Sequence, residues 1–215
     1  DLTTGNYNIA IGTSAVGDAT TQEGNVGIGY GALGNTTADK NTGVGFRAAE
    51  LTTTGTGTTA VGNEALYTNE TGSNNTSIGD QSLKVCTGSQ NTALGSGAGH
   101  GTNGATSGSN NIFIGYNSTP SSATVSNEVT VGNSSVTKFR VPGTNLESGS
   151  GVLDVKNSGT ASEMRLYCES NNAHYAALKA PAHADFSGNL TYTLPSGYGS
   201  NGQVLSSNGS GGTSW

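Results

Sequence analysis

An aliphatic residue followed by glycine recurs at a nearly fixed interval through the first 140 residues. The eight glycines of this pattern, called the repeat glycines below, are Gly12, Gly29, Gly45, Gly62, Gly79, Gly95, Gly115 and Gly132. Successive repeat glycines are separated by 17, 16, 17, 17, 16, 20 and 17 residues. An interval of this size is typical of solenoids, in which each repeat packs mainly on its neighbours. We therefore expect an elongated stack of coils.

The residues before each repeat glycine predict a short β-strand. The position directly before the glycine is always Ile, Val or Leu, and the position two residues earlier is Ile, Val or Thr, as in Ile9 and Ile11. A mostly small residue lies between them. This alternation, together with the β-branched side chains, favours a strand over a helical turn. Glycine suits a bend at the end of the strand because it tolerates positive φ and close backbone approach.

A second short arm follows each glycine. The third residue after the glycine is always Ala or Ser, and the next is often aliphatic, as in Val16, Leu33, Leu66, Leu83 and Val136. Six of the eight repeats also place Asn four residues before the glycine: Asn8, Asn25, Asn41, Asn75, Asn91 and Asn111. Two explanations fit these asparagines equally well. They form a hydrogen-bonded ladder along the solenoid axis, or they serve the turn that precedes the strand.

A single coil has too little apolar surface to fold by itself. Burial of its aliphatic pair would contribute about 1.5–3 kcal/mol per side chain. Ordering its backbone costs about 1–2 kcal/mol per residue. Only 32% of the residues are hydrophobic and 35 are glycine, which is little for a self-sufficient core. We therefore expect several copies of the chain to associate along the long axis and to share an interior.

The repeat pattern ends near residue 143, which predicts two domains, residues 1–143 and 144–215. The segment Val141-Pro142-Gly143 carries a Pro-Gly pair that marks the boundary. Four strand-like runs follow: Val152–Lys156, Met164–Glu169, Tyr175–Ala180 and Leu190–Leu194. We expect a β-rich C-terminal module.

Two repeats, residues 25–33 and 75–83, resemble the head repeats of trimeric autotransporter adhesins, and copies with longer loops, such as residues 68–74, resemble stretches of bacteriophage tail fibres. The resemblance implies an all-β homotrimer of left-handed parallel β-rolls with about eight coils of 16–17 residues. The chain departs from the adhesin pattern in its longer period and in the 20-residue step before Gly115.

The C-terminal segment is similar to a module of tail fibres from marine and cyanobacterial phages. The similarity runs through residues 164–167, 177–181, 190–195 and 202–205 and the closing Ser214-Trp215. It implies an interwoven β-prism-like module and a structural tail fibre that mediates attachment to the host surface. The implied partners are further copies of the chain, other virion tail proteins and a host cell-surface glycan or protein, and the implied location is the extracellular virion. The alternatives are the head of a trimeric adhesin on the bacterial cell surface and a tailspike that depolymerises glycans.

The charge pattern narrows the set of partners. The formal net charge is −6, with eight Lys and Arg and no basic stripe, so we expect no nucleic-acid binding. No apolar run is long enough to cross a bilayer, so we expect no membrane insertion. The chain begins at Asp1 rather than Met, and we expect it to be a fragment or a processed product.

Residues with reactive side chains are scattered, and we expect no enzyme and no cofactor. Glu64 and Asp80 lie one repeat apart and could meet as an acid pair, but no His or basic partner accompanies them in the sequence. For His174, His183 and Asp185 a surface or trimer-interface role is favoured over a metal site, so no metal is expected. Cys86 and Cys168 fall in different domains, where burial as small side chains is favoured over a disulfide.

Four residues are candidates for surface recognition. Tyr30, Phe46 and Tyr116 directly follow repeat glycines, so stacking would align them in a row that suits a sugar. Shielding of the bend from water is the favoured alternative. His100, the fourth, lies alone in a Gly-rich stretch. The surrounding loop 96–110 is either a binding protrusion or a tolerated insertion.

Overall fold

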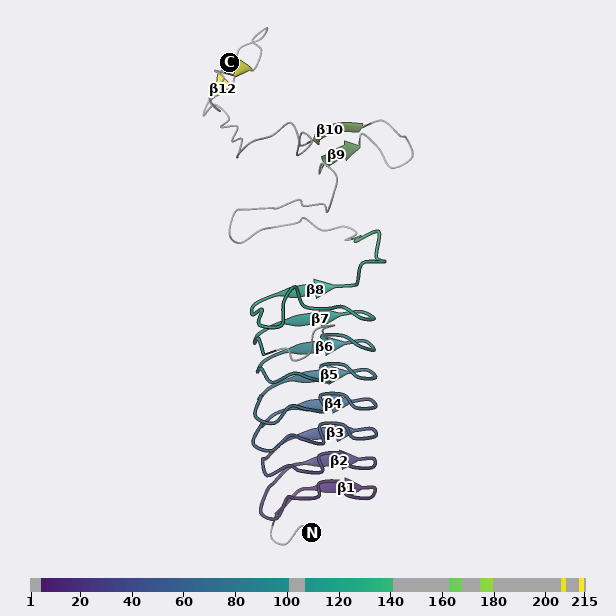
Figure 1. Ribbon diagram of the computed structural model, residues 1–215, viewed down its shortest axis with the longest axis vertical. Coiled ribbons are helices and arrows are strands. Elements are labelled where there is room, and N and C mark those ends of the chain that lie inside the picture. The colour runs from purple at the N-terminus through teal and green to yellow at the C-terminus, as the bar shows by residue number, and fades with distance from the viewer. Residues whose placement is uncertain are drawn as a thin grey trace. The chain divides into compact units, whose positions relative to one another are not determined.

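The structure, a computed structural model, describes residues 5–100 and 107–140, together with the backbone of four short strands further along the chain. The chain divides into two compact units, Asp1–Val141 and Pro142–Trp215. The described part of the first unit is a stack of coils, called the roll below (Figure 1). Its strands are β1 (Ile9–Ile11), β2 (Val26–Ile28), β3 (Thr42–Val44), β4 (Thr59–Val61), β5 (Thr76–Ile78), β6 (Thr92–Leu94), β7 (Ile112–Ile114) and β8 (Val129–Val131).

The eight strands form one parallel sheet in sequence order, with each strand hydrogen-bonded to the next. Pairing is in register throughout, so equivalent positions of neighbouring repeats lie side by side, as Ile28 and Val44 do. The described residues contain no helix. The predicted all-β parallel solenoid is therefore confirmed, and each predicted strand ends directly before its repeat glycine.

The 20-residue step between Gly95 and Gly115 leaves this register intact. Thr92 still pairs with Ile112, and Leu94 pairs with Ile114. The extra residues of this repeat therefore enter the connecting segment and not the ladder.

Each repeat glycine makes the bend that its position predicts. Gly62 has φ of 135°, and a Cβ atom built on it would lie 2.4 Å from the carbonyl oxygen of Gly79 in the next coil. Neither the dihedral angle nor the contact is open to an L-residue with a side chain. The amide of Gly62 donates to Val44 of the preceding coil, so the bend belongs to the ladder.

The second arm is a series of turns and not a strand. The fourth residue after the glycine adopts positive φ although it carries a side chain, for example 54° at both Leu33 and Leu66. This backbone places the leucine side chain inside the coil, where it is fully buried. Its amide donates to the third residue after the glycine in the next coil, as Leu66 does to Ser82, so the turns also form a ladder.

The coil interior and the outer sheet face are built from different residues of the same three-residue strands. The middle residue points inward, and from β2 to β7 it is buried: Gly27, Gly43, Ala60, Ser77, Ala93 and Phe113. The flanking aliphatic pair points outward, and many of its members are exposed, including Ile9, Ile28, Ile78, Leu94 and Val131. The expectation that a coil buries its aliphatic pair within one chain is therefore wrong. The closely spaced walls of the coil leave room mainly for small residues and for the leucines of the second arm.

The predicted asparagine ladder is present inside the roll. Each asparagine side-chain oxygen accepts the backbone amide at the equivalent position of the next coil, as Asn25 does from Asn41 at 2.9 Å. Its Nδ2 donates to a backbone carbonyl in the connection to the next coil, which is Ala38 in the case of Asn25. One amide thus satisfies two backbone groups that the coil buries, and this joins the ladder explanation with the turn explanation.

The second unit contains two antiparallel pairs. In the first, β9 (Glu163–Tyr167) pairs with β10 (Tyr175–Lys179), and in the second, β11 (Ser206–Ser207) pairs with β12 (Thr213–Ser214). Strands β9 and β10 coincide with two of the predicted runs, whereas β11 and β12 were not predicted. The predicted runs 152–156 and 190–194 lie outside the described residues.

Candidate functional site: an aromatic and charged strip beside the sheet

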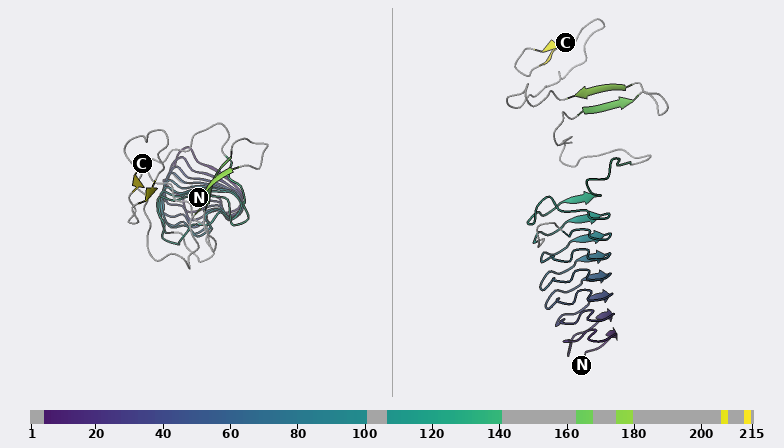
Figure 2. Two further views of the ribbon diagram at one scale, coloured as in Figure 1. Left: turned by 90° about the horizontal axis from the view of Figure 1, so that it is seen from above. Right: turned by 45° about the vertical axis from the view of Figure 1, so that its right-hand side comes forward.

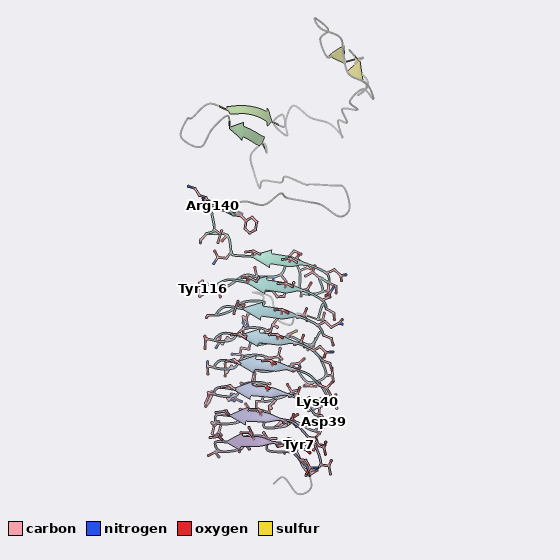
Figure 3. All side chains as sticks on the ribbon, turned by 180° about the vertical axis from the view of Figure 1, so that it is seen from behind. Tyr7, Asp39, Lys40, Tyr116 and Arg140 are labelled. Atoms are coloured by element: carbon pink, nitrogen blue, oxygen red, sulfur yellow. The ribbon has the colours of Figure 1, made fainter. Side chains whose placement is uncertain are left out.

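The residues directly after the repeat glycines form a column at the edge of the sheet where the strands end. Tyr116 lies at this edge, opposite the edge that carries Asp39 and Lys40 (Figure 3). In chain order the column consists of Thr13, Tyr30, Phe46, Asn63, Asp80, Ser96, Tyr116 and Asn133. Stacking the coils therefore aligns the three predicted aromatic residues in one column.

Only two of these three aromatic residues come together. The rings of Tyr30 and Phe46 stack with centroids 5.5 Å apart and planes inclined by 15°. Tyr116 is separated from them by three polar residues and is 66% exposed. The predicted aromatic row is thus one stacked pair and one isolated ring.

Arg47 extends the stacked pair into the neighbouring coil. Its guanidinium carbon lies 6.0 Å from the ring centroid of Phe46 and 4.5 Å from that of Tyr67. The same guanidinium donates to the Tyr67 hydroxyl and to Glu50. Such contacts fix the long arginine side chain against aromatic surfaces that would otherwise leave it mobile.

Glu64 links this arginine to the next coil. Its carboxylate lies 3.6 Å from an Arg47 nitrogen and 2.7 Å from the Lys84 ammonium, and it accepts a hydrogen bond from Gln81. The hydrogen bond from Lys84 is the main reason why the pKa of Glu64 lies below its ordinary value, against an opposing effect of burial. Glu64 is therefore held as a carboxylate between two cations.

Asp80 continues the column without joining the ion pairs. It accepts a hydrogen bond of 2.8 Å from the side-chain amide of Asn63, its neighbour one coil below. Glu64 and Asp80, weighed above as an acid pair, thus have separate partners.

We call these residues the bend-side strip. It comprises Tyr30, Phe46, Arg47, Glu50, Asn63, Glu64, Tyr67, Asp80, Gln81 and Lys84. Its members come from four successive coils, and their side chains are held by mutual contacts before any ligand arrives. Such preorganisation reduces the entropy that is lost on binding. Chemically, the strip combines exposed aromatic rings with amide and carboxylate groups, and therefore suits a ligand with both apolar and hydroxyl-bearing faces.

The sequence contained a signal for the part of the strip that the prediction missed. Arg47, Glu64 and Gln81 each lie two residues after a repeat glycine, whereas Glu50, Tyr67 and Lys84 each lie five residues after one. The first set and the second set therefore stack as two adjacent columns. Aligning the charged and polar residues on the glycine, as was done for the aromatic residues, would have found both.

His100 does not belong to the exposed surface of the strip. It occupies the same repeat position as Lys84 one coil further on, and its Nδ1 is buried with no hydrogen-bond partner among the described residues. Burial lowers its pKa, and the charge of Lys84 adds to this effect. A neutral, partly covered imidazole is poorly placed to contact a surface ligand.

The remaining reactive residues of the sequence analysis lie elsewhere. Cys86 is a buried free thiol whose pKa is raised to about 11 by burial. Cys168, its proposed disulfide partner, lies outside the described residues, as do His174, His183 and Asp185. Within the described ranges, no group of three His, Cys, Asp or Glu residues is arranged to hold a metal ion. The same ranges contain no helix of the length and apolarity that a membrane span requires.

Comparison with known proteins does not place the chain in a family. No protein-family model matches it, and no curated protein or solved structure does so either. The case for a function therefore comes from the residues and their geometry.

Proposed function

We propose that this chain is a segment of a homotrimeric fibre that attaches a phage tail to the host surface. In this proposal three left-handed rolls pack through their sheets around a common axis. The C-terminal residues continue as an interwoven β-prism-like module in the same trimer.

The outer face of the eight-stranded sheet is the observation that carries the proposal. Its sixteen outward positions hold twelve Ile, Val or Leu residues and four threonines, and none is charged. The sheet runs the length of the described roll (Figure 2). A continuous apolar face on a soluble chain marks an interaction site.

A second copy of the same chain is the occupant that fits this face best. Polar and charged residues flank the sheet at both edges, with Asp39 and Lys40 on one side and the bend-side strip on the other. An apolar centre with a polar rim is the usual anatomy of a protein interface. Identical copies also have the same spacing between coils, so their side chains interdigitate along the whole length.

The attachment role rests on the resemblance to tail fibres and on the bend-side strip. The strip lies at the margin of the sheet, so its exposed rings remain available when the sheet faces are covered. A host cell-surface glycan or protein is the partner that this role requires. The location that follows is the virion, outside the host cell.

Sedimentation and cell binding test the two parts of the proposal separately. The full chain is expected to sediment as a trimer at neutral pH and to adsorb to bacterial cells of a susceptible host. A folded, soluble monomer would contradict the trimer, and a trimer that adsorbs to no host cell would contradict the attachment role.

The head of a bacterial surface adhesin is the second candidate, because the same sheet face and the same resemblance support it. The complete reading frame separates the two: a membrane-anchoring barrel and a coiled-coil stalk downstream would assign the chain to a bacterium. A glycan depolymerase is tested by incubating the trimer with host polysaccharide. New reducing ends that disappear in a Glu64→Gln or Asp80→Asn variant would assign a catalytic role.

A further inference from the structure

Polar side chains from two repeat positions form a line inside the roll, which we call the interior polar column. One position lies four residues before the repeat glycine and the other lies seven residues after it. The described column includes Asn41, Thr52, Thr58, Asn69, Asn75, Cys86 and Asn91, all buried. Neighbours in the column touch: the Nδ2 of Asn91 donates to the Cys86 sulfur at 3.4 Å.

Thr58 interrupts the asparagine ladder at the fourth coil. Its backbone amide still donates to Asn41 from the coil below. Its side chain, however, carries no amide group that could continue the ladder upward. By analogy with the other coils, an asparagine here would accept from the Asn75 amide and donate to the Gly72 carbonyl.

Asn69 restores only one of these two missing bonds. Its Nδ2 donates to the Gly72 carbonyl at 2.7 Å, the same carbonyl position that the ladder asparagines serve in other coils. Asn75 lies beside it, because a Cβ atom built on Gly72 would lie 2.3 Å from the Asn69 Oδ1 and 3.0 Å from the Asn75 Nδ2. Within the described residues, no hydrogen bond from the Asn75 backbone amide replaces the one lost at Thr58.

The unsatisfied groups of the roll concentrate at this interruption. Four buried side-chain atoms have no hydrogen-bond partner in the described part of the chain, and three of them are Thr52 Oγ1, Thr58 Oγ1 and Asn69 Oδ1. These three residues are consecutive members of the interior polar column and are 0% exposed. A buried polar group without a partner costs about 1–3 kcal/mol, so three neighbouring ones would be costly together.

We propose that the fourth coil contains a specific internal binding site for one water molecule. The water donates to Asn69 Oδ1 and to one threonine hydroxyl, and it accepts from the other hydroxyl and from the Asn75 backbone amide. Buried waters typically make about three hydrogen bonds to such groups. The site thus carries the ladder across the coil that lacks its asparagine.

The chemistry of the site favours water over an ion. Its ligands are two hydroxyls, one amide oxygen and one N–H donor, and no carboxylate is among them. A cation would lack a neutralising charge, and the N–H group would point its positive end toward it. A water molecule can both donate and accept, which this mixed set requires.

The decisive test is a high-resolution crystal structure of the full chain, combined with thermal unfolding of variants. Spherical density is expected within hydrogen-bond distance of Thr58 Oγ1 and Asn69 Oδ1. Thr58→Val keeps the shape but removes one ligand, so the water should lose occupancy and the Tm should fall. The double variant Thr58→Asn with Asn69→Thr rebuilds the ladder at this coil, and is expected to displace the water and recover the Tm. Thr36→Val is the matched control for the loss of a buried hydroxyl, since Thr36 already pairs with Ala38.

Each result decides the proposal. Direct hydrogen bonds among Thr52, Thr58 and Asn69, with no density between them, would overturn it, as would an unchanged Tm in Thr58→Val. A Tm that depends on which monovalent cation is present would assign an ion and also overturn it. If Thr58→Val fails to fold, the density in the unmodified protein still gives the answer.

Discussion

The coil interior and the outer sheet face differ sharply although the same strands supply both. In β5, Ser77 points inward, is fully buried and bonds to Ser82 of its own coil, whereas Ile78 points outward and is 39% exposed. The inward residue closes one coil around small and hydrogen-bonded groups. The outward residue has no comparable cover within the described roll. The comparison teaches that the interior determines whether a coil can form, while the outer face determines whether chains associate.

A charge on the outer face should have the largest effect. Ile78→Lys places an ammonium group in the middle of the uncharged sheet, so three copies would bury three unpaired cations at the shared axis. We expect loss of the trimer in sedimentation velocity. Val85→Lys, in the same coil but away from the sheet, is the control and should leave the assembly unchanged. A trimer that survives Ile78→Lys would place the contact elsewhere.

A side chain on a repeat glycine should disrupt both faces at once. Gly62→Ala forces φ of 135° on alanine and drives its Cβ against the Gly79 carbonyl. We expect the free energy of unfolding to fall by at least about 4–5 kcal/mol, measured by urea denaturation. In contrast, Gly24 has φ of 69° and open space around its Cβ. Gly24→Ala should cost only about 1–2 kcal/mol, the usual penalty for a left-handed residue.

An exchange of volume inside the sixth and seventh coils provides a test confined to the interior. Phe113 is the one large residue in the inward column of β1–β8, and it fills space beside Gly99, which stands where other coils carry leucine. Phe113→Ala should cost about 3–5 kcal/mol, measured by chemical denaturation, through the cavity it leaves.

The same exchange should be reversible. Gly99→Leu alone should destabilise, because its Cβ would lie 2.8 Å from the Phe113 ring. Combined with Phe113→Ala, it should recover part of the loss, since leucines at this position of other coils adopt the same left-handed backbone. Two losses that simply add would show that these positions do not share one space.

The smallest expected effect concerns the ion pairs of the bend-side strip. The folded state lowers the pKa of Glu64, so its stabilising contribution is fully present above the ordinary glutamate pKa and is lost as pH falls through the lower folded value. The Tm difference between the unmodified chain and Glu64→Gln should therefore shrink on acidification. Glu70→Gln, at an exposed acid outside the strip, is the control. A difference that stays constant with pH would show that the ion pairs do not contribute.

The strands and bends could be predicted from the sequence because both depend on local chemistry. The aliphatic residue and glycine at the end of each strand fix the position of the bend, and the period of two fixes the alternation of faces. The side that is buried could not be read from that alternation. It depends on how close the walls of the coil lie, and the small residues at Gly27, Ala60 and Ala93 were the relevant signal.

Compensation between coils was the part that sequence reasoning missed. Asn69 replaces one bond of the asparagine that is absent at Thr58, and Phe113 fills the space beside Gly99. Each pair joins residues that are far apart in the local pattern but adjacent once the columns are aligned. For the candidate site, the aromatic column was predicted, but the stacking of Tyr30 on Phe46 and the contacts of Arg47 required the geometry.

The ladder register that survives the 20-residue repeat means that the roll counts rungs and not residues. Insertions between β6 and β7 change the outline of one loop, and duplication of a whole repeat would simply lengthen the stack. Loss of a single residue within a strand would have the opposite outcome, because it would turn that rung inside out and expose its small residue to the neighbouring chain. Such a chain can therefore vary freely in loop and in length while its strands stay nearly fixed.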